Sequence, residues 1–164
     1  MHSKSYRFLT PLIMVLTWAN MEAQTSHPVP RLVVNVTIDQ LRTDYMEAFS
    51  SLFGAGGFNK VMRDGRSYMD AAYPFSHIDR ASAVACIMTG TVPYDNGIVG
   101  EHWMDRKTLR PMYCVDDATC EGWLTSEKYS PVALNVSTVT DELKMATGGR
   151  ALVYSIAPDA DAAI

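Results

Sequence analysis

The sequence has few cysteines, and they match no metal-binding pattern. Three occur among 164 residues, and none stands in the paired Cys and His spacing of a zinc site. Cys114 and Cys120 lie six residues apart in a turn-rich stretch, where an oxidising compartment would permit a disulfide. Cys86 lies in an apolar helical pattern and is interpreted as a small buried residue, not as a reactive thiol.

Strong charge, repeats and long apolar runs are scarce as well. The formal net charge is -4, with acidic and basic residues intermixed, which argues against a nucleic-acid-binding surface or a polybasic membrane patch. The sequence contains no internal repeat and no low-complexity tract. Its 164 residues are enough for one domain with a real core.

The first residues resemble an export signal. Lys4 and Arg7 precede an apolar run from Phe8 to Ala19 that is too short to span a bilayer. We interpret residues 1–23 as a signal peptide and residues 24–30 as a linker to the first strand. The expected location is therefore secreted or periplasmic, with no membrane span beyond the signal peptide.

Residues 31–40 form the most informative stretch of the chain. The run is rich in β-branched residues and does not alternate with polar ones, which is typical of a strand buried on both faces in a parallel sheet. A helical pattern follows Asp39, which places this carboxylate at the carboxyl end of a strand, where ligands bind in open α/β sheets. Asp39 is therefore a candidate metal ligand or general base. Alternatively, it caps the following helix.

The remaining pattern predicts an α/β fold with a doubly wound, mostly parallel sheet, helices on both faces and a β-hairpin insertion. Helices are expected at 41–53, at 58–64 with a left-handed Gly65 closing it, at 81–88, at 139–147 after a Thr138 capping box, and after Pro158. Further strands are expected at 66–73 and 151–156, an Asn96-Gly97 turn, the hairpin at 101–117 and an irregular loop at 118–136. Because nothing would then cover the last strand, residues 31–164 are expected to be the amino-terminal portion of a longer domain.

Several motifs, taken in order, resemble the alkaline phosphatase superfamily. Within it they resemble the secreted bacterial branch related to type I phosphodiesterases and nucleotide pyrophosphatases, which has a threonine nucleophile. The motifs that carry this resemblance are Val33-Val-Asn-Val-Thr-Ile-Asp-Gln-Leu-Arg42, Gly56-Gly-Phe58, Met88-Thr-Gly90, Pro93, Gly97-Ile98, Trp103-Met-Asp-Arg-Lys-Thr108, Tyr113-Cys-Val-Asp-Asp117, Ser130-Pro131 and Thr140-Asp-Glu-Leu143.

The resemblance implies a phosphoric ester hydrolase with two Zn²⁺ ions. One metal activates a hydroxyl nucleophile, the other stabilises the leaving oxygen, and a phosphoenzyme forms on a small phosphate ester. Asp39 matches the first metal ligand of that family, and it is the one ligand expected within this chain.

The other functional positions carry different residues here. The position of the nucleophilic threonine is Arg80, whose guanidinium has no available lone pair with which to attack phosphorus. Glu101 stands where relatives place an asparagine that donates to phosphate, and Asp159 and Asp161 stand where they place a lysine and an arginine. Three carboxylates in place of an amide donor and two cations would reverse the sign of the electrostatic field that a bound phosphate meets.

Substitute roles remain open at this point. Ser82 is a weak candidate nucleophile near a helix start, with a small packing or capping serine as the alternative. Arg80 is expected to pair with Asp79 or with an acidic substrate group, and His77 is interpreted as an exposed loop residue. Three functions fit: a metal-dependent phosphatase or phosphodiesterase with rearranged phosphate groups, a non-catalytic binding protein of the cell envelope, or a truncated inactive product. In all three cases the isolated chain is expected to be inactive.

Overall fold

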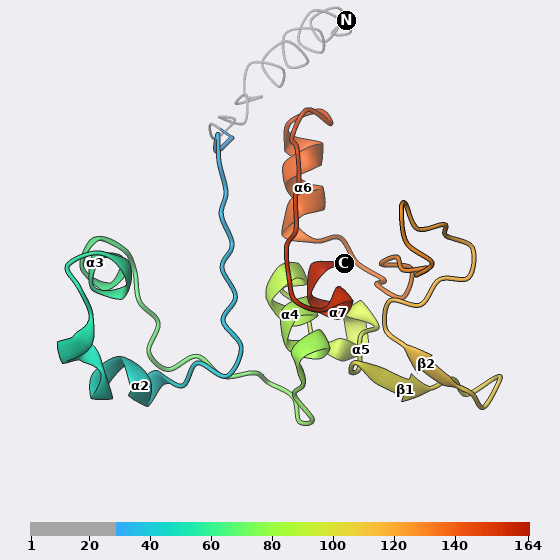
Figure 1. Ribbon diagram of the computed structural model, residues 1–164, viewed down its shortest axis with the longest axis horizontal. Helices are drawn as coiled ribbons and strands as arrows, with labels where there is room; N and C mark the ends of the chain where they lie inside the picture. The colour runs from blue at the N-terminus through green and yellow to red at the C-terminus, as the bar shows by residue number, and fades with distance from the viewer. Residues whose placement is uncertain (1–28) are drawn as a thin grey trace, which may run out of the picture. The chain divides into compact units, whose positions relative to one another are not determined.

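An extended segment precedes a series of short helices. The computed structural model describes residues 29–164, so the predicted signal peptide and most of the predicted linker lie outside the described residues. Residues 1–33 and residues 34–164 form separate units, and every helix and strand of the described part belongs to the second one (Figure 1). Within residues 29–164, no helix has the length and apolar character needed to cross a membrane.

The first helices are shorter than the sequence pattern predicts. The expected helix at 41–53 is split into α2, Thr43–Ala48, and a 3-10 turn η1, Ser50–Leu52, with Phe49 between them. Helix α3 covers Gly57–Asp64 as expected, but Gly65 has a φ of -104°. The predicted left-handed cap at Gly65 is therefore wrong, because the chain leaves this helix in an extended conformation.

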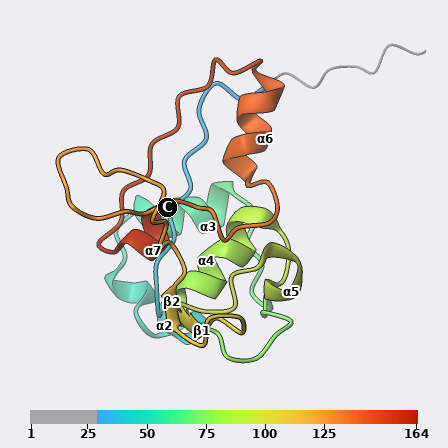
Figure 2. The same cartoon turned by 90° about the vertical axis from the view of Figure 1, so that its right-hand side faces the viewer.

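Helix α4, Arg80–Thr89, is the element with which three later helices pack. Asp79 caps its start and Gly90 ends it with a left-handed φ of 69°. Helix α5, Pro93–Asn96, follows at once and closes at Gly97, φ 88°, as the Asn96-Gly97 turn signal predicts. Helix α4 contacts α5 and also two later helices, α6, Val139–Ala146, and α7, Ala160–Ala163 (Figure 2).

The predicted hairpin and the loop after it are confirmed. Strand β1, His102–Met104, pairs antiparallel with β2, Pro111–Tyr113, with Trp103 opposite Met112. Residues 118–136 contain no helix and no strand beyond an isolated bridge between Asp116 and Tyr129 at their base. The predicted capping box of α6 is present, since the Thr138 side chain accepts from the Asp141 backbone and Asp141 accepts from Thr138.

The core is small and lies where α4, the hairpin and α7 meet. Its buried apolar residues are Ala81, Ile98, Cys114 and Val115. Partly buried side chains surround them, namely Ala85, Trp103, Tyr113, Tyr129, Ala133, Leu134 and Ala160. Neither α2 nor α3 contributes to this cluster, so the fold around it is built by residues 79–161.

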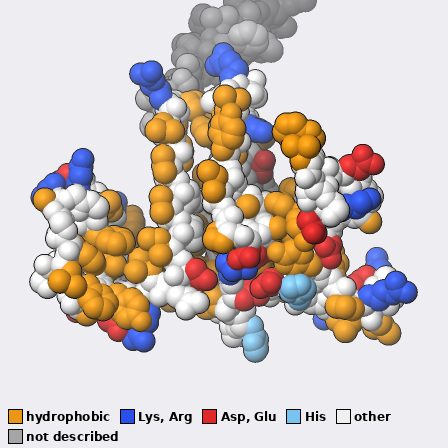
Figure 3. Space-filling view, in the orientation of Figure 1, with side chains coloured by type: hydrophobic (Ala, Val, Ile, Leu, Met, Phe, Trp, Pro, Cys, Tyr) orange, Lys and Arg blue, Asp and Glu red, His pale blue; other side chains and the backbone are white. Residues whose placement is uncertain are grey.

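Three predicted strands are extended but unpaired among residues 29–164. The segments 31–38, 66–73 and 151–156 join no ladder, and their side chains are largely exposed, Val36 by 73% and Ile156 by 97%. The prediction that the first segment is buried on both faces is therefore wrong for the described residues, whose only strands, β1 and β2, form one antiparallel hairpin. A parallel strand needs a neighbouring backbone on which to bond, and the described chain offers none. Hydrophobic side chains consequently line the outside of the first and last segments (Figure 3).

We expect Gly97→Ala to destabilise the fold more than Gly90→Ala. Both glycines have positive φ, which costs an L-residue roughly 1–2 kcal/mol. A Cβ at Gly97 would also overlap the side-chain amide of Asn135 and lie 2.7 Å from the Ala133 carbonyl oxygen, whereas Gly90 has open space. Overpacking adds about 1–3 kcal/mol at Gly97 only. Urea midpoints followed by circular dichroism measure the difference, and equal losses would contradict the crowding.

Candidate functional site

Four charged side chains from distant parts of the chain meet beside the start of α4. Arg80 is the first residue of that helix, Glu101 immediately precedes β1, and Asp159 and Asp161 lie at the start of α7. The residues at these four positions differ from those that the family resemblance implies. The structure brings all four together.

Arg80 directs its whole guanidinium at carboxylates. Its Nε and Nη2 donate to Oδ2 and Oδ1 of Asp161, each at 2.9 Å, which is the bidentate geometry of a strong arginine–carboxylate pair. Its Nη1 lies 2.8 Å from Oδ2 of Asp159, and Nη2 lies 4.0 Å from Oε2 of Glu101. The hydrogen bonds to Asp161 raise the pKa of Arg80 above its ordinary range, so the group stays charged. The predicted pairing of Arg80 with Asp79 is wrong, because Asp79 is engaged elsewhere.

Asp161 is the buried member of this ion-pair network. Its side chain is 0% exposed, while those of Arg80 and Asp159 are 31% and 52% exposed. Tyr113 of β2 supports it, since the phenol donates to Asp161 Oδ1 at 3.4 Å and accepts from the Asp161 backbone N–H at 3.2 Å. Burial, together with the charge of Asp161, raises the pKa of Tyr113. His102 stacks on the other side of this ring at 4.8 Å between centroids.

Sequence reasoning did not identify Tyr113 as part of the site. The hydrogen bond joins residues 48 positions apart, and no local spacing marks such a pair. The pairing of Asp161 with Arg80, 81 positions apart, is equally invisible to periodicity. What the sequence does show is that the charges occur where relatives carry other residues.

Asp79 and Ser82 form the start of α4 and not a reactive pair. The Asp79 carboxylate accepts from the Ser82 backbone at 2.9 Å, from the Ser82 hydroxyl at 2.8 Å and from the Glu101 backbone at 2.6 Å. Partial burial raises the pKa of Asp79, but the backbone hydrogen bonds from Ser82 and Glu101 outweigh it, and the pKa falls below its usual value. Ser82 is 0% exposed. The structure thus places the weak candidate nucleophile in a capping box.

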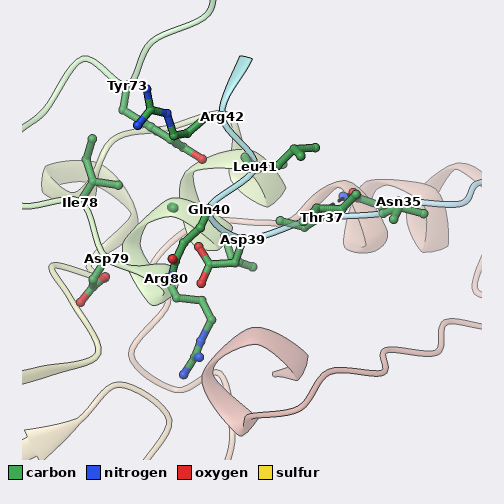
Figure 4. A pocket seen from close by; sticks show the side chains of 15 residues that line it. Asn35, Thr37, Asp39, Gln40, Leu41, Arg42, Tyr73, Ile78, Asp79 and Arg80 are labelled. Carbon is green, nitrogen blue, oxygen red and sulfur yellow. Dashed lines mark hydrogen bonds between the residues drawn. The ribbon is translucent and has the colours of Figure 1, made fainter. Parts of the chain in front are cut away.

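Asp39 lies apart from the Arg80 network, on the wall of a pocket. This cavity of about 630 Å³ lies between the extended segment 35–42 and the side of α4 that carries Ala83, Val84 and Ile87. The Arg80 side chain also borders it, but its guanidinium extends away from Asp39 toward α7 (Figure 4). Helix α2 is capped by Arg42, so Asp39 does not serve as its N-cap.

No cluster of three or more His, Cys, Asp or Glu side chains able to hold a metal occurs within residues 29–164. Asp39 is therefore not part of a complete set of three ligands in the described part of the chain. His77 lies in an exposed bend with a φ of 60°, and its exposure agrees with its interpretation as a loop residue.

The three cysteines are free thiols in this structure, so the possible bridge between Cys114 and Cys120 is not formed. Burial raises the pKa of Cys114 to about 11, and the hydrogen bond from Cys120 to Asp117 raises the pKa of Cys120. Both thiols are therefore poor nucleophiles at neutral pH. Cys86 is half-buried on α4, in keeping with a packing role.

The chain is similar to known phosphatases along most of its length. The sequence profile of the family described as type I phosphodiesterase / nucleotide pyrophosphatase matches residues 33–162. Alkaline phosphatase PhoV of Synechococcus elongatus is 40% identical over 130 residues, which are 77% of this chain and 24% of that protein. Alkaline phosphatase PafA of Elizabethkingia meningoseptica is 30% identical over 154 residues, 92% of this chain and 28% of that one.

Solved structures agree with the sequence matches. The crystal structure of wild-type alkaline phosphatase PafA superposes with a TM-score of 0.79 at 32% identity, covering 83% of this chain and 27% of that one. A variant of PafA with one threonine, one asparagine, one lysine and one arginine substituted gives a TM-score of 0.69 over the same share. The fold is thus of the α/β class of these phosphatases, although this chain spans only about a quarter of their length.

We expect Arg80→Met to destabilise the fold by about 2–4 kcal/mol, because the buried Asp161 carboxylate loses its charged partner. Asp161→Asn in the Arg80→Met background should recover part of that loss, since the neutral amide is cheaper to bury. Asp159→Asn, at a half-exposed carboxylate, serves as the control and should cost under about 1 kcal/mol. Urea unfolding measures all three, and a double variant no more stable than Arg80→Met would contradict a buried ion pair.

We also expect Asp79 to contribute to acid sensitivity. Its pKa is lowered in the folded state, so its contribution is complete above the unfolded pKa of about 4 and is lost as the pH falls through the lowered value. Asp79→Asn keeps a good N-cap but cannot titrate. Urea midpoints between pH 6 and pH 2.5 should therefore fall less steeply for the variant. Parallel curves for the two proteins would exclude this role.

Proposed function

The chain belongs to the type I phosphodiesterase / nucleotide pyrophosphatase family of the alkaline phosphatase superfamily, and from that premise we propose that it is a non-catalytic member. Its relatives are phosphoric ester hydrolases. The proposal rests on one observation, the Arg80 guanidinium bound by the carboxylates of Asp161 and Asp159. We infer that this cluster occupies the place at which a relative would handle phosphate.

The residue positions support this reading. In the substituted PafA structure, the threonine and asparagine are separated along the chain as Arg80 and Glu101 are here, and the lysine and arginine as Asp159 and Asp161 are. We infer that Arg80 stands at the nucleophile position and the three carboxylates at phosphate-binding positions. In this chain a cation and three anions satisfy one another instead.

These four residues are unsuited to phosphoryl transfer. An arginine has no lone pair available for attack at any pH that a protein survives. Its positive charge is already matched by Asp161 and Asp159, so an incoming phosphate would meet the remaining negative charge of the cluster. Two like charges about 4 Å apart repel by about 4 kcal/mol at the screening of a protein surface. Ser82 offers no substitute alcohol, because it is buried and hydrogen-bonded to Asp79.

The family is metal-dependent, and by resemblance the metal is Zn²⁺, two ions to a site. The described residues do not fit such a group, because no set of three potential ligands occurs in residues 29–164, and the pocket beside Asp39 offers one further carboxylate, Asp79, which is hydrogen-bonded at the start of α4. We therefore assign this chain no metal-assisted step. Asp39 at the pocket wall is proposed as a single inherited ligand.

We further propose that residues 31–164 form the amino-terminal portion of a longer, exported protein with a doubly wound parallel sheet. The unpaired segments 31–38 and 151–156 would then find strand neighbours in the remainder of that protein. A signal peptide at residues 1–23 would direct it to the periplasm or the medium. Whether it binds a phosphate ester or another ligand there depends on the same charge cluster.

The observation that favours a hydrolase instead is the pocket of about 630 Å³ beside Asp39, which is large enough for a small phosphate ester. The two functions separate in one assay on the longer protein that we propose contains this chain, because the isolated chain is expected to be inactive in either case. We expect that protein to hydrolyse neither p-nitrophenyl phosphate nor bis(p-nitrophenyl) phosphate above the buffer rate with added Zn²⁺. Zinc-dependent turnover that disappears in Asp39→Ala would overturn the non-catalytic proposal.

The charge cluster is tested by binding, not by turnover. We expect inorganic phosphate at millimolar concentration to leave the melting temperature of the wild-type chain and of Arg80→Thr unchanged, since three carboxylates remain in the single variant. The combined variant Arg80→Thr, Glu101→Asn, Asp159→Lys and Asp161→Arg should instead be stabilised by phosphate. Sodium chloride at matched ionic strength is the control, and phosphate protection of the wild-type chain contradicts the proposal.

A further inference from the structure

A loop beyond the hairpin holds two large apolar side chains out in solvent. Trp123 and Leu124 are each 90% exposed, and Leu124 has a positive φ of 60°, a conformation that is rare for a bulky residue. Strain of this kind persists where the surrounding structure fixes it, and it is concentrated at functional positions. We call these two residues the loop tip.

The neck of this loop is fixed by Asp117. Its carboxylate accepts from the Thr119 backbone at 2.9 Å, from the Thr119 hydroxyl at 2.6 Å and from the Ser130 hydroxyl at 2.5 Å. The Asp117 backbone N–H donates to the Lys128 carbonyl at 2.9 Å, which closes the two sides of the loop. These hydrogen bonds lower the pKa of Asp117, so the neck stays anionic and closed at neutral pH. The loop tip is therefore presented by a built support.

A second feature offers a complementary surface. An open depression of about 650 Å³ lies against the β1–β2 hairpin and is lined by the apolar residues Val99, Trp103, Met104 and Met112. Arg106 and Lys107 stand at the hairpin turn beside it and form no ion pair within the described residues. Methionine side chains adapt to the shape of what they contact.

The charges beside the two features are opposite. Glu121 and Glu127 flank the loop tip, are exposed, and form no salt bridge in residues 29–164. Arg106, Lys107 and Asp105 border the depression, so that two cations and one anion leave its rim with a net positive charge. The 118–128 loop and the turn of the β1–β2 hairpin lie apart in both views of the molecule, so the two features of one chain do not meet (Figures 1 and 2).

We propose that the loop tip of one chain docks into the hairpin depression of a second copy, with Glu121 and Glu127 facing Arg106 and Lys107. A depression of this volume accommodates an indole and a leucine side chain. The contact is heterologous, because the two surfaces differ, and it either closes into a ring or two-fold pair or continues as a chain of copies. Two apolar side chains bury far less than the roughly 1,600 Å² of a standard interface, so self-association is weak and concentration-dependent. This inference is independent of the proposed function.

Sedimentation velocity of the full chain over a concentration series tests the contact. We expect the wild-type sedimentation coefficient to rise with concentration, and that rise to be lost in Trp123→Ser/Leu124→Ser, whose solvent-exposed positions leave the fold intact. Arg106→Glu/Lys107→Glu and Glu121→Lys/Glu127→Lys should each abolish association alone, because each places like charges on both surfaces. An equimolar mixture of these two variants should restore it.

The matched control for Arg106→Glu/Lys107→Glu is Lys60→Glu/Arg150→Glu, which makes the same change in net charge at exposed positions away from both surfaces. It should associate as the wild-type chain does. A wild-type chain that stays monomeric, or association that persists in the loop-tip and charge variants, overturns the proposal and assigns any association to the exposed extended segments. Blue-shifted Trp123 fluorescence on phosphatidylcholine vesicles, lost in Trp123→Ser/Leu124→Ser and without any self-association, would assign the tip to a lipid surface instead.

Discussion

The bidentate pair between Arg80 and Asp161 is the interaction on which the packing of α4, α7 and the hairpin depends. It joins the first residue of α4 to the start of α7 across 81 positions, and Tyr113 connects the same carboxylate to the hairpin. Because Asp161 is fully buried, its charge is tolerated only while Arg80 remains in place. The small apolar core lies beside this pair, and the three elements that form the core are the three that the pair connects.

Local signals in the sequence predicted local structure well. The Thr138 capping box, the Asn96-Gly97 turn and the hairpin are confirmed, because each depends on interactions within a few residues. The predicted strands at 31–38 and 151–156 are extended but unpaired, because pairing depends on a neighbour that the described residues do not supply. Gly65 was misjudged for a related reason: a glycine after a helix permits a left-handed cap but does not require one.

The candidate site shows the same division. The resemblance indicated that Arg80, Glu101, Asp159 and Asp161 differ from the residues of relatives. For Arg80, however, the sequence suggested only the adjacent Asp79 or an acidic substrate group as a partner. In the structure Asp79 is occupied by three hydrogen bonds at the start of α4, and the partner of Arg80 comes from the far end of the chain. Two opposite charges far apart in a sequence do not by themselves predict an ion pair. They do so only when the fold is known to bring their positions together.

The mutual dependence of Arg80 and Asp161 also constrains which substitutions the chain tolerates. Replacing either residue alone leaves a buried carboxylate without its charged partner or a guanidinium without its anchor, and each such intermediate is less stable than the paired state. The two positions are therefore coupled, so that a change at one is tolerated best when the other changes with it.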